Sequence, residues 1–455
     1  MFGIKINNYR SFSNQYFDFS RVNILIGENS SGKSSLIKFL LFLKRSAKFT
    51  SSSFKFTYEL GKFDDFVYGH NNDLCISFDF LFGKEYIEFF NKHLSDKEEF
   101  NQICKETLSL KGEDAKIKLT FTFDKNVLSS NDVLIRIENK YFGSVELNRN
   151  NSKKENIIEG EQCDIKFYSK HSDKEFILED VNYEQRGFFS LTNGIDVKSK
   201  IEKIEGMNMS IFYHMAFMLI SQNYAEDLLK MMSYVNPISS TPERSYDENE
   251  RQGVLYKVKD ISDVVNILSD ESLETIVRET LLSDLNKALR FYGILHEVKV
   301  TNSSFGPKEL KVKVNKGGIW SNIKDVGYGS SLQIPIIFQA LVANISGGEI
   351  IIIEQPEVHI HPLLQSKFIE TLVKIGDKNT YLIETHSSDL IRKLQVLVKN
   401  KEYKLNPEAV NIYYFKKTKS ISEITKHQIN DYGKLIPKFP SGFYDSSVNL
   451  VKELF

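Results

Sequence analysis

The sequence has few cysteines, no apolar run long enough to cross a membrane and no secretory leader. Its three cysteines lie far apart and form no Cys-x-x-Cys or Cys/His spacing, which excludes a disulfide framework and a structural zinc site. The longest apolar stretch, residues 332–345, is shorter than a membrane span and contains polar amides. The first residues lack the profile of a signal peptide. We therefore expect a cytoplasmic protein without a membrane partner.

An excess of charge is also absent. Lys and Arg total 59 and Asp and Glu total 60, so the net charge of −1 argues against a uniformly basic coat for nucleic acid. Charge is nevertheless uneven, because residues 1–60 carry nine basic and three acidic side chains and residues 391–438 carry eleven and four. Two basic ends brought together could hold the phosphates of a nucleotide or of a nucleic acid. An ordinary solvated surface is the alternative.

What is present indicates an ordered chain of several domains, with 455 residues, 41% hydrophobic side chains and only nine prolines. A period-two pattern over residues 74–180 predicts antiparallel strands with one exposed face, interrupted by a helix near residues 84–110. Helical periodicity dominates residues 198–292, broken by a predicted loop at 236–252, and an α/β pattern follows. The predicted regions are an N-terminal lobe, a helical insertion and a C-terminal lobe, over residues 1–190, 191–295 and 296–455.

The strongest motif is GENSSGKS at residues 27–34, between an apolar strand (22–26) and a helix (34–45). Gly27 and Gly32 permit the backbone angles that let successive N–H groups wrap a phosphate. We expect Lys33 to reach the β- and γ-phosphates and the Ser34 hydroxyl to bind Mg²⁺. The remaining predicted phosphate-binding positions are Asn29, Ser30, Ser31 and Ser35. An ordinary Gly-rich turn is the alternative, but the strand and helix on either side favour a nucleotide site.

A second motif follows four consecutive isoleucines at residues 350–353, which predict a buried parallel strand. Glu354 ends this strand, at the edge of an α/β sheet where phosphates and Mg²⁺ bind, and we expect it to hold the metal. Glu357 lies three residues further on and could hold or activate the attacking water. The alternative is that Glu357, His359 and His361 belong to an ordinary surface loop.

Two further motifs are smaller. The strand over residues 380–383 leads into His386, which is suited to contact the γ-phosphate, although a histidine at a strand end is often only structural. The sequence DVGYGSS at residues 325–331 opens an apolar helix. A glycine-rich turn at a helix start is a general anion-binding site.

Together and in this order, the four motifs resemble the ABC-type ATPase heads of the SMC, RecF and overcoming-lysogenization-defect class. The match is closer to a bacterial branch of AAA-like ABC ATPases, through the segments 8–12, 325–331, 353–362, 383–394 and 442–445. It covers residues 1–70 and 320–450, and the middle of the chain agrees in layout. Within that branch, the chain resembles the ATPase subunit of Septu-type or retron-associated antiphage systems.

The resemblance implies an α/β fold, in which a P-loop mixed sheet and an antiparallel β lobe form an ABC-type head with an inserted helical subdomain. It also implies a dimer, or a higher oligomer, that holds ATP and Mg²⁺ between its copies. One copy contributes residues 27–34, and the other caps the nucleotide with Gly329 and Ser331. Arg10 occupies the place of the family's N-terminal arginine and is expected near the nucleotide. Arg244 resembles another arginine of the family, without an assigned role.

Two positions depart from the ABC pattern. Gln355 stands where ABC ATPases usually carry the catalytic glutamate, and an amide cannot act as a base. Either Glu357 takes over, or hydrolysis is slow or triggered by a partner and ATP mainly clamps the dimer; we favour the second. No glutamine stands where the Q-loop would fall, and Asp64 or Asp65 is the nearest substitute.

Three functions compete. The first is an ATP-gated sensor or scaffold that controls a separate nuclease or toxin in antiphage defence, since too few residues follow His386 for a nuclease domain of the chain's own. The second is a RecF/SMC-like repair ATPase that clamps duplex DNA, although charge near zero and the lack of a coiled-coil arm oppose its long-armed form. The third, a transporter subunit, is opposed by the long separation of residues 27–34 from 325–331.

Overall fold

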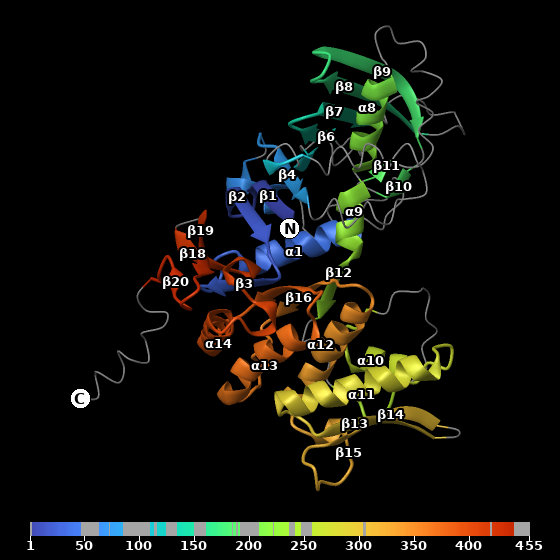
Figure 1. The fold of residues 1–455 in the computed structure, drawn as a ribbon, viewed down its shortest axis with the longest axis vertical. Helices are drawn as coiled ribbons and strands as arrows, with labels where there is room; N and C mark the ends of the chain where they lie inside the picture. The colour runs from blue at the N-terminus through green and yellow to red at the C-terminus, as the bar shows by residue number, and fades with distance from the viewer. Residues whose placement is uncertain are drawn as a thin grey trace, which may run out of the picture. The chain divides into compact units, whose positions relative to one another are not determined.

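The computed structural model describes most of the chain in two compact units (Figure 1). Unit 1 contains Met1–Phe19, Ser34–Lys230 and Lys417–Glu423, and unit 2 contains Ser20–Lys33, Met231–Lys416 and Ile424–Phe455. The described residues are 2–46, 63–71, 73–84, 110–112, 116–123, 134–149, 161–183, 185–187, 190–191, 209–221, 223–235, 242–246, 257–303, 306–418 and 421–440. Three predicted features lie wholly or mostly outside these ranges, at residues 84–110, 236–252 and 442–445.

Unit 1 is built on an eight-stranded antiparallel sheet with the strand order β2-β1-β4-β5-β6-β7-β8-β9. Its strands are β1 (Phe2–Tyr9), β2 (Phe12–Phe19), β4 (Ile76–Phe82), β5 (Ile117–Phe123), β6 (Leu134–Asn139), β7 (Gly143–Arg149), β8 (Glu161–Ser169) and β9 (Lys174–Tyr183). Alternate residues on one face are apolar, so that Phe78 stacks on Phe121 with ring centroids 5.1 Å apart. The prediction of antiparallel strands is confirmed.

Two helices pack on this apolar face. Helix α1 (Lys33–Ser46) places Phe39 edge-on against Phe78, and α8 (Met209–Ser221) lies along β6, β7 and β8 (Figure 1). The smaller elements of the unit are α3 (Phe63–Phe66), η1 (Tyr68–His70), the pair β10 (Gln185–Gly187) and β11 (Ser190–Leu191), and α9 (Asn223–Lys230).

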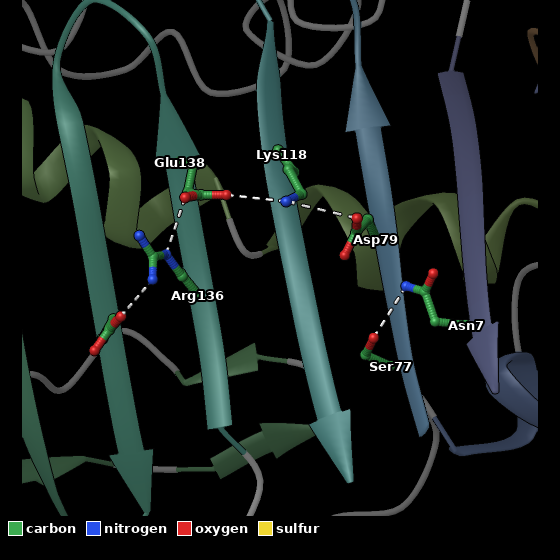
Figure 2. A network of polar contacts seen from close by, with 7 residues as sticks. Asn7, Ser77, Asp79, Lys118, Arg136 and Glu138 are labelled. Atoms are coloured by element: carbon green, nitrogen blue, oxygen red, sulfur yellow. Dashed lines mark hydrogen bonds and ion pairs between the residues drawn. The ribbon is translucent and has the colours of Figure 1, made fainter. Parts of the chain in front are cut away.

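The opposite face carries charges of alternating sign on adjacent strands (Figure 2). Lys118 Nζ lies 3.6 Å from Asp79 and 3.0 Å from Glu138. Arg136 in turn contacts Glu138 at 3.0 Å and Glu146 at 2.9 Å. Arg136 and Glu138 both belong to β6, and the other three pairs join β4 to β5, β5 to β6 and β6 to β7.

Unit 2 contains a seven-stranded mixed sheet with the order β12-β16-β17-β3-β18-β19-β20. The strands from β12 to β18 are parallel, and β20 pairs antiparallel with β19. The strands are β12 (Met232–Val235), β16 (Ile350–Glu354), β17 (Thr380–Glu384), β3 (Val22–Gly27), β18 (Val410–Thr418), β19 (Ile421–Ile429) and β20 (Leu435–Ile436). The chain is thus an α/β protein, and the larger two of its described sheets are one mixed and one antiparallel.

Helices surround the parallel strands, which are buried on both faces as their continuous apolar runs predict. These helices are α10 (Ile261–Leu268), α11 (Thr275–Tyr292), α12 (Tyr328–Ile345), α13 (Pro362–Ile375) and α14 (Ser388–Lys399). A separate three-stranded sheet contains β13 (Glu297–Ser303), β14 (Gly306–Lys313) and β15 (Ser321–Asn322). Among the described residues, no helix is both long and apolar enough to cross a membrane.

One sequence prediction is wrong within unit 2. The stretch 198–292 was expected to be helical on either side of a loop, but residues 232–235 form the edge strand β12. Their backbone pairs in parallel with β16, from Met232 opposite Ile350 to Val235 opposite Ile353. A four-residue strand is too short to give a clear period, and its partner lies more than a hundred residues away. The division of the chain at residues 190 and 295 stays a prediction.

A buried histidine in β19 gives unit 2 a dependence on pH. His427 packs against Phe439, and its Nδ1 lies 2.7 Å from the carbonyl oxygen of Pro437, which requires the hydrogen on Nδ1. Its Nε2 is buried without a hydrogen-bond partner among the described residues. Burial lowers the pKa of this imidazole, and the Pro437 carbonyl only partly opposes the shift.

We therefore expect the protein to lose stability as the pH falls below about 6.5, the ordinary value for histidine. The unfolded chain then binds a proton that the folded state accepts only at lower pH. Substitution His427→Asn keeps a donor for Pro437 and removes the titration, so its melting temperature should fall less between pH 7.5 and 5.5 than that of wild type. Equal decreases in the two proteins would assign the pH dependence to other groups.

Candidate functional site

The loop after β3 has the backbone that its glycines predict. Gly27, Ser30 and Gly32 have positive φ angles of 142°, 58° and 106°. A Cβ atom on Gly27 would lie 2.0 Å from the carbonyl oxygen of Phe415, which accepts a hydrogen bond from Glu28 N at 3.1 Å. Only glycine can therefore occupy position 27, because the backbone of β18 lies too close to the start of the loop for a Cβ atom.

Lys33 points back into this loop. Its Nζ donates to the carbonyl oxygens of Gly27 at 3.0 Å and Glu28 at 2.6 Å, and only 4% of the residue is exposed. Burial lowers the pKa of the ammonium group, while the carboxylates of Glu384 and Glu28 oppose the shift. The loop thus holds a cation where the phosphate of a P-loop ligand would bind.

The carboxyl ends of the parallel strands bring acidic side chains to the same edge. Glu354 of β16 and Glu384 of β17 are direct neighbours in the register of the sheet. Glu384 is buried, and its charge acts on Lys33. Tyr234 of β12 donates from its hydroxyl to Glu354 Oε1 at 2.7 Å. The predicted metal-binding carboxylate is therefore held by a hydrogen bond from the edge strand.

Glu357 and His386 come together in the structure. Glu357 Oε1 accepts a hydrogen bond from the backbone N–H of His386 at 2.6 Å. Glu357 Oε2 is buried and has no hydrogen-bond partner among the described residues, so it is available to a ligand or a water. Burial and the nearby charge of Lys33 lower the pKa of His386, and Glu357 opposes the shift. The lowered pKa favours the neutral form of the His386 imidazole.

Gln355 begins the turn that carries the chain from β16 to Glu357. It has a positive φ of 45°, and its N–H donates to the carbonyl oxygen of Glu384 at 2.7 Å. The turn continues with a hydrogen bond from Val358 N to Gln355 O at 3.2 Å. The backbone at Gln355 thus joins the ends of β16 and β17, and its side chain is half-buried.

The turn at residues 325–331 is fastened to the loop that follows β16. A Cβ atom on Gly329 would lie 2.1 Å from the carbonyl oxygen of His359, so α12 approaches this loop as closely as glycine allows. One helical turn later, Gln333 Nε2 donates to Pro356 O at 3.0 Å. Ser331 is buried and donates to Tyr328 O at 2.7 Å, whereas Ser330 is half-exposed. The hydroxyl at the surface of this turn is therefore that of Ser330.

Several predicted residues belong to unit 1. Arg10 lies in the turn between β1 and β2 with a φ of 49°, its N–H donating to Phe66 O at 2.7 Å. Its guanidinium lies 5.6 Å from the ring centroid of Tyr9. Ser34 and Ser35 follow Lys33 in the first turn of α1, and Asp65 is exposed. The ligand contacts expected of these residues stay predictions.

The donors at this site suit a metal ion that arrives with a nucleotide. Among the described residues, no group of three or more His, Cys, Asp or Glu side chains could hold a metal by itself. Mg²⁺ in nucleotide sites takes one or two carboxylates and completes its shell with phosphates and waters. Within unit 2, the carboxylate of Glu354 has the chemistry of that role, and the part expected of the Ser34 hydroxyl stays a prediction.

Sequence reasoning missed two residues of the site, Tyr234 and Glu384. Glu384 had a visible signal, because it ends an apolar strand as Glu354 does. Tyr234 had none, because residues 232–235 were not predicted to form a strand.

We predict that Tyr234→Phe raises the Mg²⁺ concentration needed for half-maximal ATP hydrolysis by roughly 10-fold or more, since loss of a hydrogen bond to a metal ligand typically has that effect. The ring remains, so packing at β12 is kept. The check is a Mg²⁺ titration of turnover, compared with nucleotide binding in the absence of divalent metal, which should not change. An unaltered Mg²⁺ requirement would limit Tyr234 to a structural role.

Comparison with known proteins gives one match over most of the chain. A family model described as an AAA ATPase domain matches residues 1–391, and one described as Protein of unknown function (DUF3696) matches residues 405–454. A search of curated proteins finds no match.

Among solved structures, the chain is similar to three SMC heads at low sequence identity. The first, an SMC head bound to the C-winged helix domain of ScpA, is 7% identical over 94% of this chain and 98% of that one, with a TM-score of 0.42. The SMC head from Thermotoga maritima is 9% identical over 93% and 97%, with a TM-score of 0.39. The third, an SMC head with an extended coiled coil bound to the C-terminal domain of ScpA derived from Pyrococcus furiosus, is 8% identical over 100% of both chains, with a TM-score of 0.41.

Proposed function

The chain belongs to the AAA ATPase domain family, and from this premise we propose that it binds Mg·ATP at residues 27–34, dimerises around it and hydrolyses it slowly or conditionally. The observation that carries the proposal is the charge arrangement of unit 2. The cation of Lys33 follows the loop after β3, and the carboxylate of Glu354 ends β16. These two parallel strands flank β17, and α/β proteins bind phosphates at the carboxyl ends of such strands.

The individual roles follow from the chemistry of each group. Lys33 exchanges its two carbonyl partners for phosphate oxygens, which are stronger acceptors because they are charged. Mg²⁺, when bound, neutralises phosphate charge, and Glu354 would hold it. Neutral His386 can accept or donate one hydrogen bond beside the γ-phosphate.

Slow hydrolysis is supported by the residues that follow β16. Gln355 cannot take a proton from water, and the base that remains is Glu357. Its Oε2 has no hydrogen-bond partner among the described residues and can orient a water, while Oε1 accepts from His386 N. A nucleotide held in this way would persist long enough to act as a clamp.

Dimerisation is supported by the turn at the start of α12. Its helix N-terminus attracts anions, and in a head-to-tail dimer it would face the nucleotide of the other copy, with Gly329 and Ser331 at the contact. We add Ser330 to this contact, because its side chain is half-exposed while Ser331 is buried.

We propose that this ATP-dependent dimer is a sensor or scaffold in the cytoplasm that controls a separate effector, a nuclease or toxin, in antiphage defence. The support is the resemblance of the motifs to that branch, together with an ATPase site built for retention of nucleotide. Among the described residues, Cys75 and Cys163 form no disulfide, which suits a reducing compartment.

A second candidate function, clamping of duplex DNA, is favoured by one surface of the three-stranded sheet. Trp320 lies close to the ammonium groups of Lys299, at 4.3 Å from the ring centroid, and Lys313, at 4.6 Å. Lysines beside an aromatic ring suit the phosphates and bases of nucleic acid.

Light scattering with and without Mg·ATP tests the dimer. Wild type should double its mass with ATP, and Ser330→Asp should remain monomeric, because a carboxylate there repels the phosphates while it favours the helix start. A wild-type protein that binds ATP and stays monomeric would contradict the proposed dimer.

The role of the dimer is tested by co-expression with the products of neighbouring genes. A stable complex with a nuclease supports effector control. Tight DNA binding by the chain alone, lost steeply as salt rises, supports the clamp instead.

A further inference from the structure

Gln365, in the first turn of α13, lies between the two loops that carry Glu357 and His386. Its Oε1 accepts a hydrogen bond from Ser387 Oγ at 2.7 Å, and its Nε2 donates to Ile360 O at 3.4 Å. Ser387 directly follows His386 in the chain. Ile360 closes the turn that begins at Glu357, because its N–H donates to Glu357 O at 3.1 Å. One side-chain amide thus contacts both loops.

These contacts complete a closed circuit of hydrogen bonds within unit 2. The circuit runs from Glu357 through the turn to Ile360, through the amide of Gln365 to Ser387, and back from His386 N to Glu357 Oε1 at 2.6 Å. It restrains Glu357 at its backbone and at its carboxylate together, and a network with every member bonded is rigid. The position of Glu357 relative to His386 therefore depends on Gln365.

The start of α14 determines which way the amide of Gln365 points. Ser387 is the N-cap of this helix, and its Oγ accepts from Leu390 N at 3.3 Å. The hydroxyl then donates its single hydrogen to Gln365, which presents its oxygen to Ser387 and its nitrogen to Ile360 O. Both ends of the amide are used, so a side chain without a donor and an acceptor at this position separates the loops from each other.

We propose that Gln365 is a positioning residue for hydrolysis, which holds Glu357 and His386 at the separation that the attacking water requires. This rests on the proposed function, in which Glu357 orients and activates that water. The described hydrogen bonds of Gln365 go to the loops after β16 and β17 and not to residues 27–34. Gln365 therefore acts on the chemical step and not on the binding of nucleotide.

Methionine in place of Gln365 tests this role. Gln365→Met keeps an unbranched side chain of similar length and loses both hydrogen bonds, so α13 should keep its packing. Single-turnover phosphate release should fall by roughly 10- to 100-fold, since small misplacements of reacting groups have effects of that size, and the affinity for Mg·ATP should not change. Gln395→Met is the matched control, because Gln395 is also half-buried and its Nε2 donates to Gly433 O at 2.7 Å, away from both loops. Its phosphate release should equal that of the wild type.

The same substitution in the Glu357→Gln background separates positioning from a general loss of stability. Because Gln365 acts through Glu357, adding Gln365→Met to Glu357→Gln should change phosphate release by less than about twofold. An equal fall in both backgrounds, or a lower affinity for Mg·ATP, would overturn the inference. Gln365→Asn keeps an amide but is one methylene too short to reach both loops. It should repeat the pattern, so the result does not depend on the folding of the methionine variant.

Failure of the inference is distinguishable from failure of the proposed function. Normal phosphate release by Gln365→Met, beside a loss in Glu357→Gln, overturns the inference alone. Unchanged release by Glu357→Gln overturns the base proposed above and the inference with it.

Discussion

Alanine in place of Lys33 should lower the affinity for Mg·ATP by about a hundredfold or more, which places binding below detection in a standard titration. Loss of charged hydrogen bonds to phosphate costs up to about 3 kcal/mol, and each 1.4 kcal/mol is a factor of ten. Lys33 is buried in the loop, where its Nζ donates to Gly27 O and Glu28 O. Calorimetric titration of the apo protein with Mg·ATP measures the effect directly.

The matched control is Lys38→Ala. Lys38 lies on the same helix, about one turn further on, and its side chain is exposed. The Lys38→Ala variant should bind nucleotide with the affinity of the wild type. Near-normal ATP affinity in Lys33→Ala, with the fold intact by circular dichroism, would remove the loop at residues 27–34 from the binding site.

Glutamine in place of Glu357 should reduce ATP turnover by roughly 10²- to 10⁴-fold, the usual contribution of a general base, with nucleotide affinity unchanged. In the structure, this substitution should remove the ability of residue 357 to take a proton and keep its hydrogen bond to His386 N. A glutamine Oε1 can still accept from His386 N, so the loop keeps its geometry, while the free oxygen that could take a proton is lost. Single-turnover phosphate release measures the chemical step apart from binding.

The substitution Gln355→Glu tests whether the amide at position 355 causes slow hydrolysis. If slow hydrolysis results from the amide at this position, a carboxylate there should raise turnover in the wild-type background. Phosphate release that is unchanged in Glu357→Gln would exclude Glu357 as the base and leave hydrolysis to a residue supplied by a partner.

The hydrogen bonds of unit 2 give a route by which a nucleotide could affect the turn at the start of α12. Gln333 of α12 donates to Pro356 O, and Gly329 packs against His359 O in the same loop. Tyr292 of α11 donates to Gln333 Oε1 at 3.2 Å. A shift of the loop that carries Glu357 would therefore move the start of α12 with it.

Local sequence determined the parts of the site that are continuous in the chain. Apolar runs specified β3, β16 and β17, because a strand buried on both faces needs no polar alternation. The glycines of residues 27–34 specified the loop, because few other residues adopt its positive φ angles. Both signals act over a few residues and are independent of the rest of the fold.

The tertiary structure decided everything that depends on strand order. The sequence does not state that β12 lies beside β16 and β17 beside β3, yet that order brings Tyr234 to Glu354 and the charge of Glu384 to Lys33. It also fixed which serine of the turn is exposed and placed Arg244 on Asp325, 81 residues away. Such pairings result from packing between distant segments, whose energy no short pattern of residues contains.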